Sequence, residues 1–313
     1  MQSEFISAEK IVSVLTYKLL VDAVERGLGL FSQSNAEDVA DNSTVDQPVR
    51  TVVNISNNGF LGCMPVYVEA DQLLVTKLVT FFPKNKDVPT HNAIIVVFSA
   101  NTGVPRAILD GDVITTRRTA AASVVATKHL ANGNPRVLAI LGCGVQASSH
   151  YEAFSDTFQL EQVRVWNHKP ERAQEFARSR EHSHNCVACD SAQDAVRDAD
   201  VVVIVTSSNT PVLMAEWIKP GAHINGVGAC RPDWAEIDPA LMKSAVVYVD
   251  SREGALKESG DIILSGAKIF AEIGEVVNGT KSAKRDKTTV FKSLGMAVED
   301  AVAAKIVLDE FGL

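Results

Sequence analysis

The chain has 313 residues, of which 46% are hydrophobic and 22% are charged, and its formal net charge is −8. This composition predicts a globular protein with a sizeable core, and the length favours two domains over one. The acidic balance argues against a nucleic-acid partner, because phosphate backbones are bound by clustered Lys and Arg. Residues 1–6 lack the layout of a signal peptide, and no apolar run reaches the roughly 20 residues of a membrane helix. We therefore expect a cytoplasmic protein without a membrane partner.

The first third of the sequence predicts a helix packed on an antiparallel sheet. Apolar residues at helical spacing follow Ser7, a candidate N-cap, and continue to about residue 24. Short β-rich runs come next, with a turn at Asn57-Asn58-Gly59, and they predict strands over 49–55, 61–68, 73–82, 93–98 and 106–109. Lys77 is conspicuous inside the apolar run 73–79, because a buried charge there needs a partner.

From Thr115 the pattern is helical until the stop signal at 132–135, and this helix is expected to connect two domains. Strands and helices then alternate. The predicted strands cover 137–141, 162–166, Val187, 201–205, 222–227 and 246–250, and the helices cover 146–158, 171–180 and 191–197. Such alternation with Val-rich and Ile-rich strands is typical of a parallel sheet covered on both faces. A last helix over 295–311 is expected to return to the first domain. The predicted fold class is α/β, a Rossmann-type doubly wound sheet with a smaller α+β domain.

A glycine-rich turn links the strand over 137–141 to the next helix. Its residues are Gly142, Cys143, Gly144, Val145, Gln146 and Ala147. Gly142 permits a tight turn, Gly144 lets the backbone approach a pyrophosphate, and the helix N-terminus offers N–H groups to the anion. The strand–turn–helix context predicts a dinucleotide site, and the alternative is a tight turn without a ligand.

The kind of dinucleotide is decided about 20 residues further on, at the end of the second strand, where NAD enzymes usually have an acidic residue. This chain has Asn167 there, followed by His168, Lys169 and Arg172. Positive side chains at this place favour a 2′-phosphate, so we expect NADPH with weaker use of NADH. The alternative is a solvated helix start.

A second local cluster combines His182, His184, Cys186 and Cys189, all of them possible zinc ligands. Structural zinc usually joins two separated ligand pairs, whereas these four residues crowd into eight positions without a second pair. We therefore expect no metal here, but a polar loop that leads into a short strand. The five cysteines are expected to be reduced thiols.

Several long segments resemble the ornithine cyclodeaminase/mu-crystallin family. They are 46–51 (DQPVRT), 111–121 (GDVITTRRTAA) and 141–147 (LGCGVQA). The segments 231–234 (RPDW), 248–251 (YVDS), 255–261 (ALKESGD) and 291–300 (FKSLGMAVED) look like its mu-crystallin branch, the ketimine reductases. The likeness runs over nearly the whole chain. Cys143 stands where relatives commonly have Ala, and His168-Lys169 replaces an Arg-Thr pair.

The resemblance implies a homodimer of two-domain subunits. Residues 1–118 and 291–313 would form the substrate-binding and dimerisation domain, and residues 119–290 the NADP-binding Rossmann domain. It also implies NADPH-dependent reduction of cyclic ketimine carboxylates, of piperideine, pyrroline or thiomorpholine type, to cyclic imino acids. Some vertebrate members of the family bind thyroid hormone.

The chemistry asks for a hydride donor, a proton source and an anchor for the substrate carboxylate. By resemblance Arg50, Lys77 and Arg118 form the carboxylate clamp, although each taken singly is more often a surface charge. Asp250 ends a strand at the carboxyl edge of the sheet, where open α/β sheets bind ligands, and it is the first candidate for handling the proton. Lys77 or a bound water are the alternatives.

Further residues are expected at the cofactor. Thr90 and His91 follow Pro89 in a loop that resembles the family's nicotinamide contact, and Arg118 is expected to contact the cofactor as well. Thr206, Ser207 and Val227 follow strands at the carboxyl edge, and Ser293 is added by resemblance.

Two other functions stay open at this point. A cyclodeaminase would use tightly held NAD to oxidise an amino acid, expel ammonia and reduce the resulting ring. A hormone-binding or lens-type protein would hold the nucleotide only as a ligand, without turnover.

Overall fold

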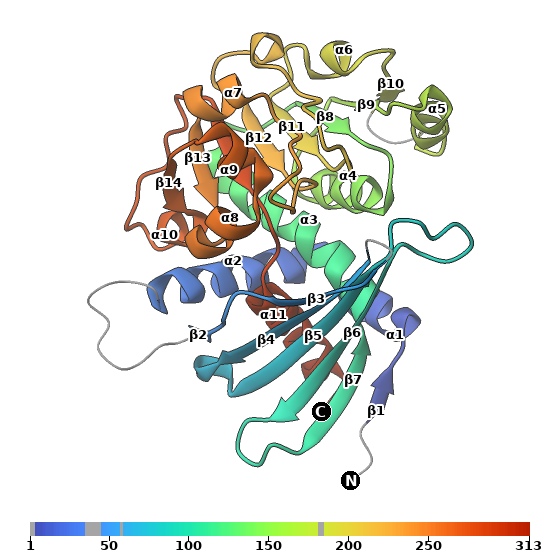
Figure 1. Ribbon diagram of the computed structural model, residues 1–313, viewed down its shortest axis with the longest axis vertical. Coiled ribbons are helices and arrows are strands. Elements are labelled where there is room, and N and C mark those ends of the chain that lie inside the picture. Colours follow the sequence, from blue (N-terminus) through green and yellow to red (C-terminus); the bar gives the residue numbers. More distant parts are fainter. Residues whose placement is uncertain (1–3, 35–44, 57–58, 181–184) are drawn as a thin grey trace. The chain divides into compact units, whose positions relative to one another are not determined.

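The structure is a computed structural model that describes residues 4–34, 45–56, 59–180 and 185–313. The chain divides into two compact units (Figure 1). The first unit comprises Met1–Thr119 and Gly295–Leu313, and the second comprises Ala120–Leu294. Residues Asn57 and Asn58 of the predicted turn lie outside the described residues. Among the described helices, none combines the length and the hydropathy needed to cross a membrane.

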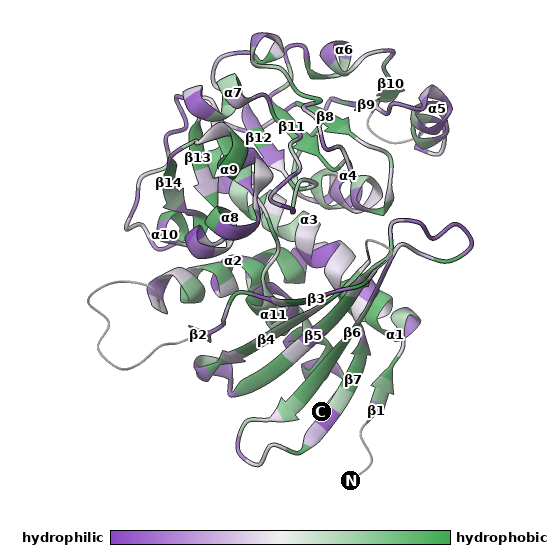
Figure 2. Ribbon diagram, viewed as in Figure 1, coloured by the Kyte–Doolittle hydropathy of each residue, from purple (hydrophilic) through white to green (hydrophobic). Residues whose placement is uncertain are grey.

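The first unit is built on one sheet whose central strands are antiparallel. The strand order is β1 (Glu4–Ile6), β7 (Pro105–Asp110), β6 (His91–Ser99), β5 (Leu73–Phe81), β4 (Phe60–Val68) and β2 (Val45–Asp46), and β3 (Thr51–Asn54) also pairs with β4. Hydrophobic residues concentrate along β4 to β7 (Figure 2). Most alternate residues of β4 and β5 are buried, with Phe60 and Val79 half-buried, because successive side chains of a strand point to opposite faces. The predicted antiparallel sheet is confirmed, while β1 and β2 were not predicted.

Helices cover the buried face of this sheet. They are α1 (Ala8–Val14), α2 (Tyr17–Ser34) and the C-terminal α11 (Ala297–Phe311). Helix α11 packs on α2, β4 and β5, so its predicted return to the first part of the chain is confirmed. The single predicted N-terminal helix was wrong, because the chain leaves helical geometry at Leu15 and starts again at Tyr17. Ser7 occupies the N-cap position, but its hydroxyl bonds the Glu9 side chain instead of the helix backbone.

Helix α3 (Gly111–Leu130) contributes residues to both units. It begins four residues before the predicted start at Thr115. The Asp110 carboxylate accepts a hydrogen bond from the backbone N–H of Val113 at 3.0 Å, which is the bond of an N-cap.

The second unit contains an eight-stranded sheet in which all described pairings are parallel. Its order is β10 (Cys186–Ala188), β9 (Gln162–Trp166), β8 (Val137–Leu141), β11 (Val201–Ile204), β12 (His223–Gly226), β15 (Thr289–Lys292), β13 (Val246–Val249) and β14 (Ile269–Glu272). The helices are α4 (Val145–Thr157), α5 (Pro170–Arg178), α6 (Ala192–Val196), α7 (Pro239–Ser244), α8 (Arg252–Glu258), α9 (Gly260–Ser265) and α10 (Ile273–Val277).

Both faces of this sheet are covered. One face packs alternate strand residues such as Leu141 and Ile204 against helical residues that include Ala195 and Leu241. On the other face Asn225 donates a hydrogen bond to Thr127 of α3 at 3.1 Å. The predicted doubly wound parallel sheet is therefore confirmed.

The predicted domain boundary at 290/291 cuts through β15. This strand pairs with β12 on one side and β13 on the other, so Phe291 and Lys292 lie in the second unit. The assignment of the two units to substrate binding with dimerisation and to NADP binding stays a prediction.

Candidate active site

Lys77 lies on the buried face of β5. Leu73 and Val75 are buried, and Lys77 continues this alternation with 1% of its surface exposed. Its ammonium contacts Asp300 Oδ2 at 2.6 Å, within the first unit. The partner that a buried lysine requires is therefore confirmed, and it comes from α11, which packs on β5.

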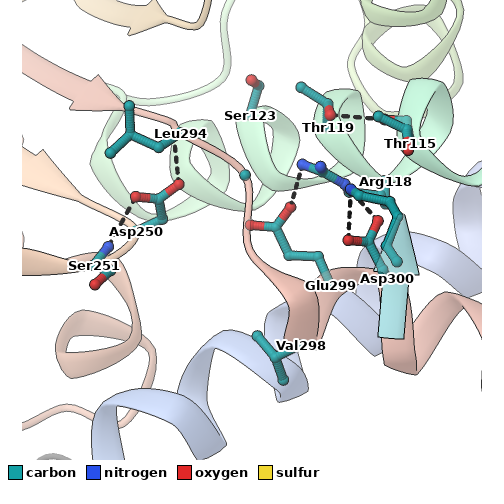
Figure 3. A network of polar contacts seen from close by, with 12 residues as sticks. Thr115, Arg118, Thr119, Ser123, Asp250, Ser251, Leu294, Val298, Glu299 and Asp300 are labelled. Carbon is teal, nitrogen blue, oxygen red and sulfur yellow. Dashed lines mark hydrogen bonds and ion pairs between the residues drawn. The ribbon is translucent and has the colours of Figure 1, made fainter. Parts of the chain in front are cut away.

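Arg118 shares the same carboxylate. Its Nε lies 3.0 Å from Asp300 Oδ1, and its Nη1 lies 2.8 Å from Glu299 Oε2 (Figure 3). Arg118 is the first residue of a stretch of α3, residues 118–127, in which every residue is buried. Both acids lie in the first turn of α11, where the helix dipole favours negative charge. We call Arg50, Lys77, Arg118, Glu299 and Asp300 the first-unit ion cluster.

Arg50 is included in this cluster because its positive charge acts on Lys77. Its Nη2 donates to the Gly295 carbonyl at 3.0 Å. Burial lowers the pKa of Lys77 to about 8, the charges of Arg118 and Arg50 act in the same direction, and Asp300 opposes them. Lys77 and Arg118 are thus paired with carboxylates, and the half-buried Arg50 brings a third cation close to them. Guanidinium and ammonium groups gathered in this way can bind an anionic ligand such as a carboxylate.

Thr90 and His91 lie in the first unit, where β6 begins. The Thr90 hydroxyl is 3.1 Å from His91 Nδ1, and the His91 ring packs against Phe81 with 4.5 Å between ring centroids. These contacts fix the conformation of the loop end. Whether the pair touches a cofactor stays a prediction.

The glycine-rich turn has the geometry of an anion cradle. Gly142 has φ +113°, and a Cβ there would meet the Val205 carbonyl oxygen at 2.7 Å, so only glycine fits. A Cβ on Gly144, the N-cap of α4, would have nothing within 4 Å. The N–H of Ser148 bonds the Gly144 carbonyl at 3.2 Å, so the N–H groups of the preceding turn point beyond the helix end. The open turn fits the pyrophosphate of a dinucleotide.

The end of β9 carries the residues that were expected to select the dinucleotide. Asn167 is half-buried, and its Oδ1 accepts the backbone N–H of Lys169 at 2.9 Å. His168, Lys169 and Arg172 are exposed at the start of α5. The positive side chains are therefore accessible to a ligand.

The register of the parallel sheet brings most predicted cofactor residues to one edge. Paired residues form a row across six strands: Trp166, Leu141, Ile204, Gly226, Lys292 and Val249. The residues that follow this row are Asn167, Gly142, Val205, Val227, Ser293 and Asp250. Because carboxyl ends of parallel strands meet at one edge, these residues adjoin each other where doubly wound sheets bind ligands.

Ser293 and the turn residues differ in exposure. Cys143 and Gln146 are half-buried, and Val145 and Ser207 are exposed. Ser293 is 1% exposed, and among the described residues its hydroxyl has no hydrogen-bond partner. At this edge of the sheet, such a hydroxyl is available to form a hydrogen bond with a polar ligand.

Asp250 has a structural role that the sequence did not reveal. Its Oδ1 accepts the N–H of Ser251 at 2.8 Å, and its Oδ2 accepts the N–H of Leu294 at 2.6 Å (Figure 3). The side chain is 1% exposed. Asp250 thus ties the end of β13 to the segment after β15, and its part in proton transfer stays a prediction.

Sequence reasoning missed a buried network at the same edge. Glu236 accepts hydrogen bonds from Thr206, and Asp261 lies 3.0 Å from the ammonium of Lys292. Lys292 is the last residue of the strand β15, so it does not interrupt an apolar run as Lys77 does. Glu236 stands in a segment without periodic pattern, and nothing local marks it.

The described residues contain no group of three or more His, Cys, Asp and Glu that could hold a metal ion. His182 and His184 of the cysteine and histidine cluster lie outside the described residues. Cys186 is buried in β10, the predicted short strand, and the backbone of Cys189 bonds Val165. All five cysteines are free thiols.

Comparison with known proteins is consistent with this geometry. The model of the ornithine cyclodeaminase/mu-crystallin family matches residues 1–312. Ketimine reductase mu-crystallin of Rattus norvegicus is 52% identical over 311 residues, 98% of this chain and 97% of the relative.

Two solved structures share the fold. Delta(1)-pyrroline-2-carboxylate reductase of Thermococcus litoralis, in complex with NADH and L-proline, has a TM-score of 0.92 at 33% identity and covers 99% of this chain and 98% of its own. An archaeal alanine dehydrogenase dimer with bound NAD has a TM-score of 0.91 at 29% identity, with coverage of 100% and 98%. The chain belongs to the ornithine cyclodeaminase/mu-crystallin family.

Proposed function

We propose that the chain is an NADPH-dependent ketimine reductase, which reduces the C=N bond of a cyclic ketimine carboxylate to a cyclic imino acid. The observation that carries the proposal is the first-unit ion cluster, which gathers three cationic side chains around two carboxylates. The relatives act on matching chemistry: one is a ketimine reductase, and another is a pyrroline-2-carboxylate reductase with L-proline, a cyclic imino acid, bound.

The residues of the chain have separate tasks in this reaction. When bound, the nicotinamide supplies the hydride. Arg50 and Arg118 hold the substrate carboxylate, because guanidinium groups bind it through paired hydrogen bonds. Lys77, with its pKa lowered to about 8, loses a proton more readily than an ordinary lysine and can donate it to the imine nitrogen. Asp250 is the alternative group for this proton.

The preference for NADPH rests on the end of β9. Asn167 replaces the usual acidic residue, and His168, Lys169 and Arg172 offer exposed donors to a 2′-phosphate. NADH is bound in the Thermococcus relative, so weaker use of NADH is part of the proposal. A specificity constant for NADH equal to that for NADPH would contradict the preference.

A homodimer is also part of the proposal, supported by the dimer of the archaeal alanine dehydrogenase. Thyroid hormone binding and a cytoplasmic location stay predictions. The first needs a direct binding measurement with the purified chain, and the second needs fractionation of cells that express it.

The function is tested by following NADPH absorbance with a five-membered, a six-membered and a sulfur-containing cyclic ketimine carboxylate. Arg118→Ala should lower kcat/KM by about 100-fold or more, because the substrate loses its alignment. Lys257→Ala, which removes an exposed ion pair on α8, is the matched control and should retain activity. Unaltered kcat/KM in Arg118→Ala would refute the clamp.

The same assay separates the reductase from a cyclodeaminase. A reductase oxidises one NADPH per product and releases no ammonia. Ammonia release from a diamino acid without net consumption of the dinucleotide would contradict the proposal, and so would NADPH binding without turnover of any ketimine.

A further inference from the structure

Glu236 is a fully buried acid in the coil between β12 and α7. Both its backbone carbonyl and its backbone N–H form hydrogen bonds. The carbonyl accepts the N–H groups of Val212 and Leu213 at 2.8 and 3.1 Å, and its own N–H donates to Asp261 Oδ1 at 2.8 Å. The side chain is therefore presented from a fixed position.

The Glu236 carboxylate joins two loops. Oε1 accepts the backbone N–H of Thr206 at 2.8 Å and the Thr206 hydroxyl at 2.5 Å, and Oε2 accepts the N–H of Ala229 at 2.8 Å. Thr206 follows β11 and Ala229 follows β12, at the carboxyl edge that also carries Gly142. A Cβ on Gly228 would collide with the Thr206 carbonyl and with Glu236, so glycine is required for this close approach.

The charges around Glu236 are unbalanced when it is ionised. Lys292 lies 3.0 Å from Asp261 Oδ2, so the one cation of this group is already paired with an acid. Burial raises the pKa of Glu236 to about 7; Lys292 and the Thr206 hydrogen bonds oppose the rise, whereas the charge of Asp261 adds to it. Small changes of pH near neutrality therefore change its charge.

We propose that Glu236 is a positioning residue of the dinucleotide site, whose ionised carboxylate holds the loops after β11 and β12 in the binding conformation and whose protonation loosens them. The carboxylate accepts three hydrogen bonds, whereas the neutral acid carries a proton where an acceptor is needed. The inference rests on the dinucleotide part of the proposed function and does not depend on the substrate.

The test is the dissociation constant of NADH, measured by fluorescence from pH 5.5 to 8.5. NADH is the probe because it has no 2′-phosphate that titrates in this range. The affinity of the unmodified chain should fall about five- to tenfold as the pH drops through about 7, since a buried hydrogen-bonded anion is lost. Glu236→Gln should bind at all pH values as weakly as the unmodified chain does at low pH.

Two further variants make the test specific. Thr206→Val removes one donor that favours the ionised acid, so the midpoint should move to higher pH. Glu272→Gln is the matched control: Glu272 is also buried and accepts a backbone N–H, from Arg252 at 2.9 Å, but it lies on the edge strand β14. It should keep the pH profile of the unmodified chain.

Two results would overturn the inference. An unchanged pH dependence in Glu236→Gln would assign the titration to another group. If Glu236→Gln does not fold, the test uses Thr206→Val. An unchanged midpoint of the pH dependence of NADH binding in that variant would refute the role of Glu236. A chain that binds no NADH at any pH would refute the dinucleotide site itself. This result differs from NADH binding without the expected pH dependence, which would refute only the role of Glu236.

Discussion

Each of the two units contains a buried ion cluster, and the two clusters differ in their charged groups. In the first unit, Lys77 and Arg118 share Asp300, and Arg50 adds a third cation. In the second unit, Lys292 pairs with Asp261, and Glu236 adds a second acid.

The two clusters show two uses of buried charges, which are the binding of a ligand and the positioning of loops. The cations of the first unit are ammonium and guanidinium groups that contact carboxylate side chains, and the same groups can bind the carboxylate of a substrate. The acids of the second unit accept backbone N–H groups of Thr206, Ala229 and Ile237, which suits them to fix loops. The first cluster is therefore expected to control substrate affinity and the second to control cofactor affinity.

The largest effect is expected from Asp300→Asn. The substitution leaves Lys77 and Arg118 with one remaining carboxylate, Glu299, inside the protein. Breaking a buried ion pair on one side costs about 3–5 kcal/mol, so the free energy of unfolding should fall by this amount. Urea denaturation measures it. Lys257→Gln, which breaks an exposed pair on α8, should cost about 0.5 kcal/mol or less. An equal loss of unfolding free energy in the two variants would show that burial does not increase the contribution of the ion pair to stability.

Asp261→Asn should destabilise the second unit less, by about 2 kcal/mol. The asparagine oxygen can still accept the N–H groups of Glu236 and Ile237, and Lys292 keeps Glu236 as a nearby acid. Because the charge of Asp261 raises the pKa of Glu236, its removal should move the midpoint of NADH binding to lower pH. Urea denaturation and the fluorescence titration check both parts. A midpoint that moves upward would show that Asp261 does not act on Glu236.

The sequence predicts the elements whose signals are local. The βα alternation located six of the eight strands of the parallel sheet and missed β14 and β15. Lys77 was marked because it interrupts an apolar run. The start of α3 was missed although Asp110 offers an N-cap, and the break between α1 and α2 has no Gly or Pro to announce it.

The partners of the site residues could not be predicted in the same way. Asp300 meets Lys77 only because α11 packs on β5, more than 200 residues away in the chain. Glu236 obtains its role from Thr206 and Asp261, which two other segments supply. No local pattern records such contacts, because they form when the sheet register and the helix packing are complete.

The smallest expected effect concerns the charge of the first-unit ion cluster. A lysine is charged below its pKa, and the pKa of Lys77 is lowered to about 8. Raising the pH from 7 to 9 therefore removes the positive charge of Lys77, and the affinity for a carboxylate should fall about tenfold, or ~1.4 kcal/mol. A ring carboxylate without nitrogen, such as furan-2-carboxylate, is the probe, because it does not titrate in this range.

Calorimetry with saturating NADPH at each pH measures this affinity without interference from the Glu236 titration. Lys77→Arg provides the control, because arginine stays charged at pH 9 and should abolish the decline. A decline that persists in Lys77→Arg would place the titrating group elsewhere. An affinity independent of pH in the unmodified chain would show that the charge of Lys77 does not contribute to binding the carboxylate.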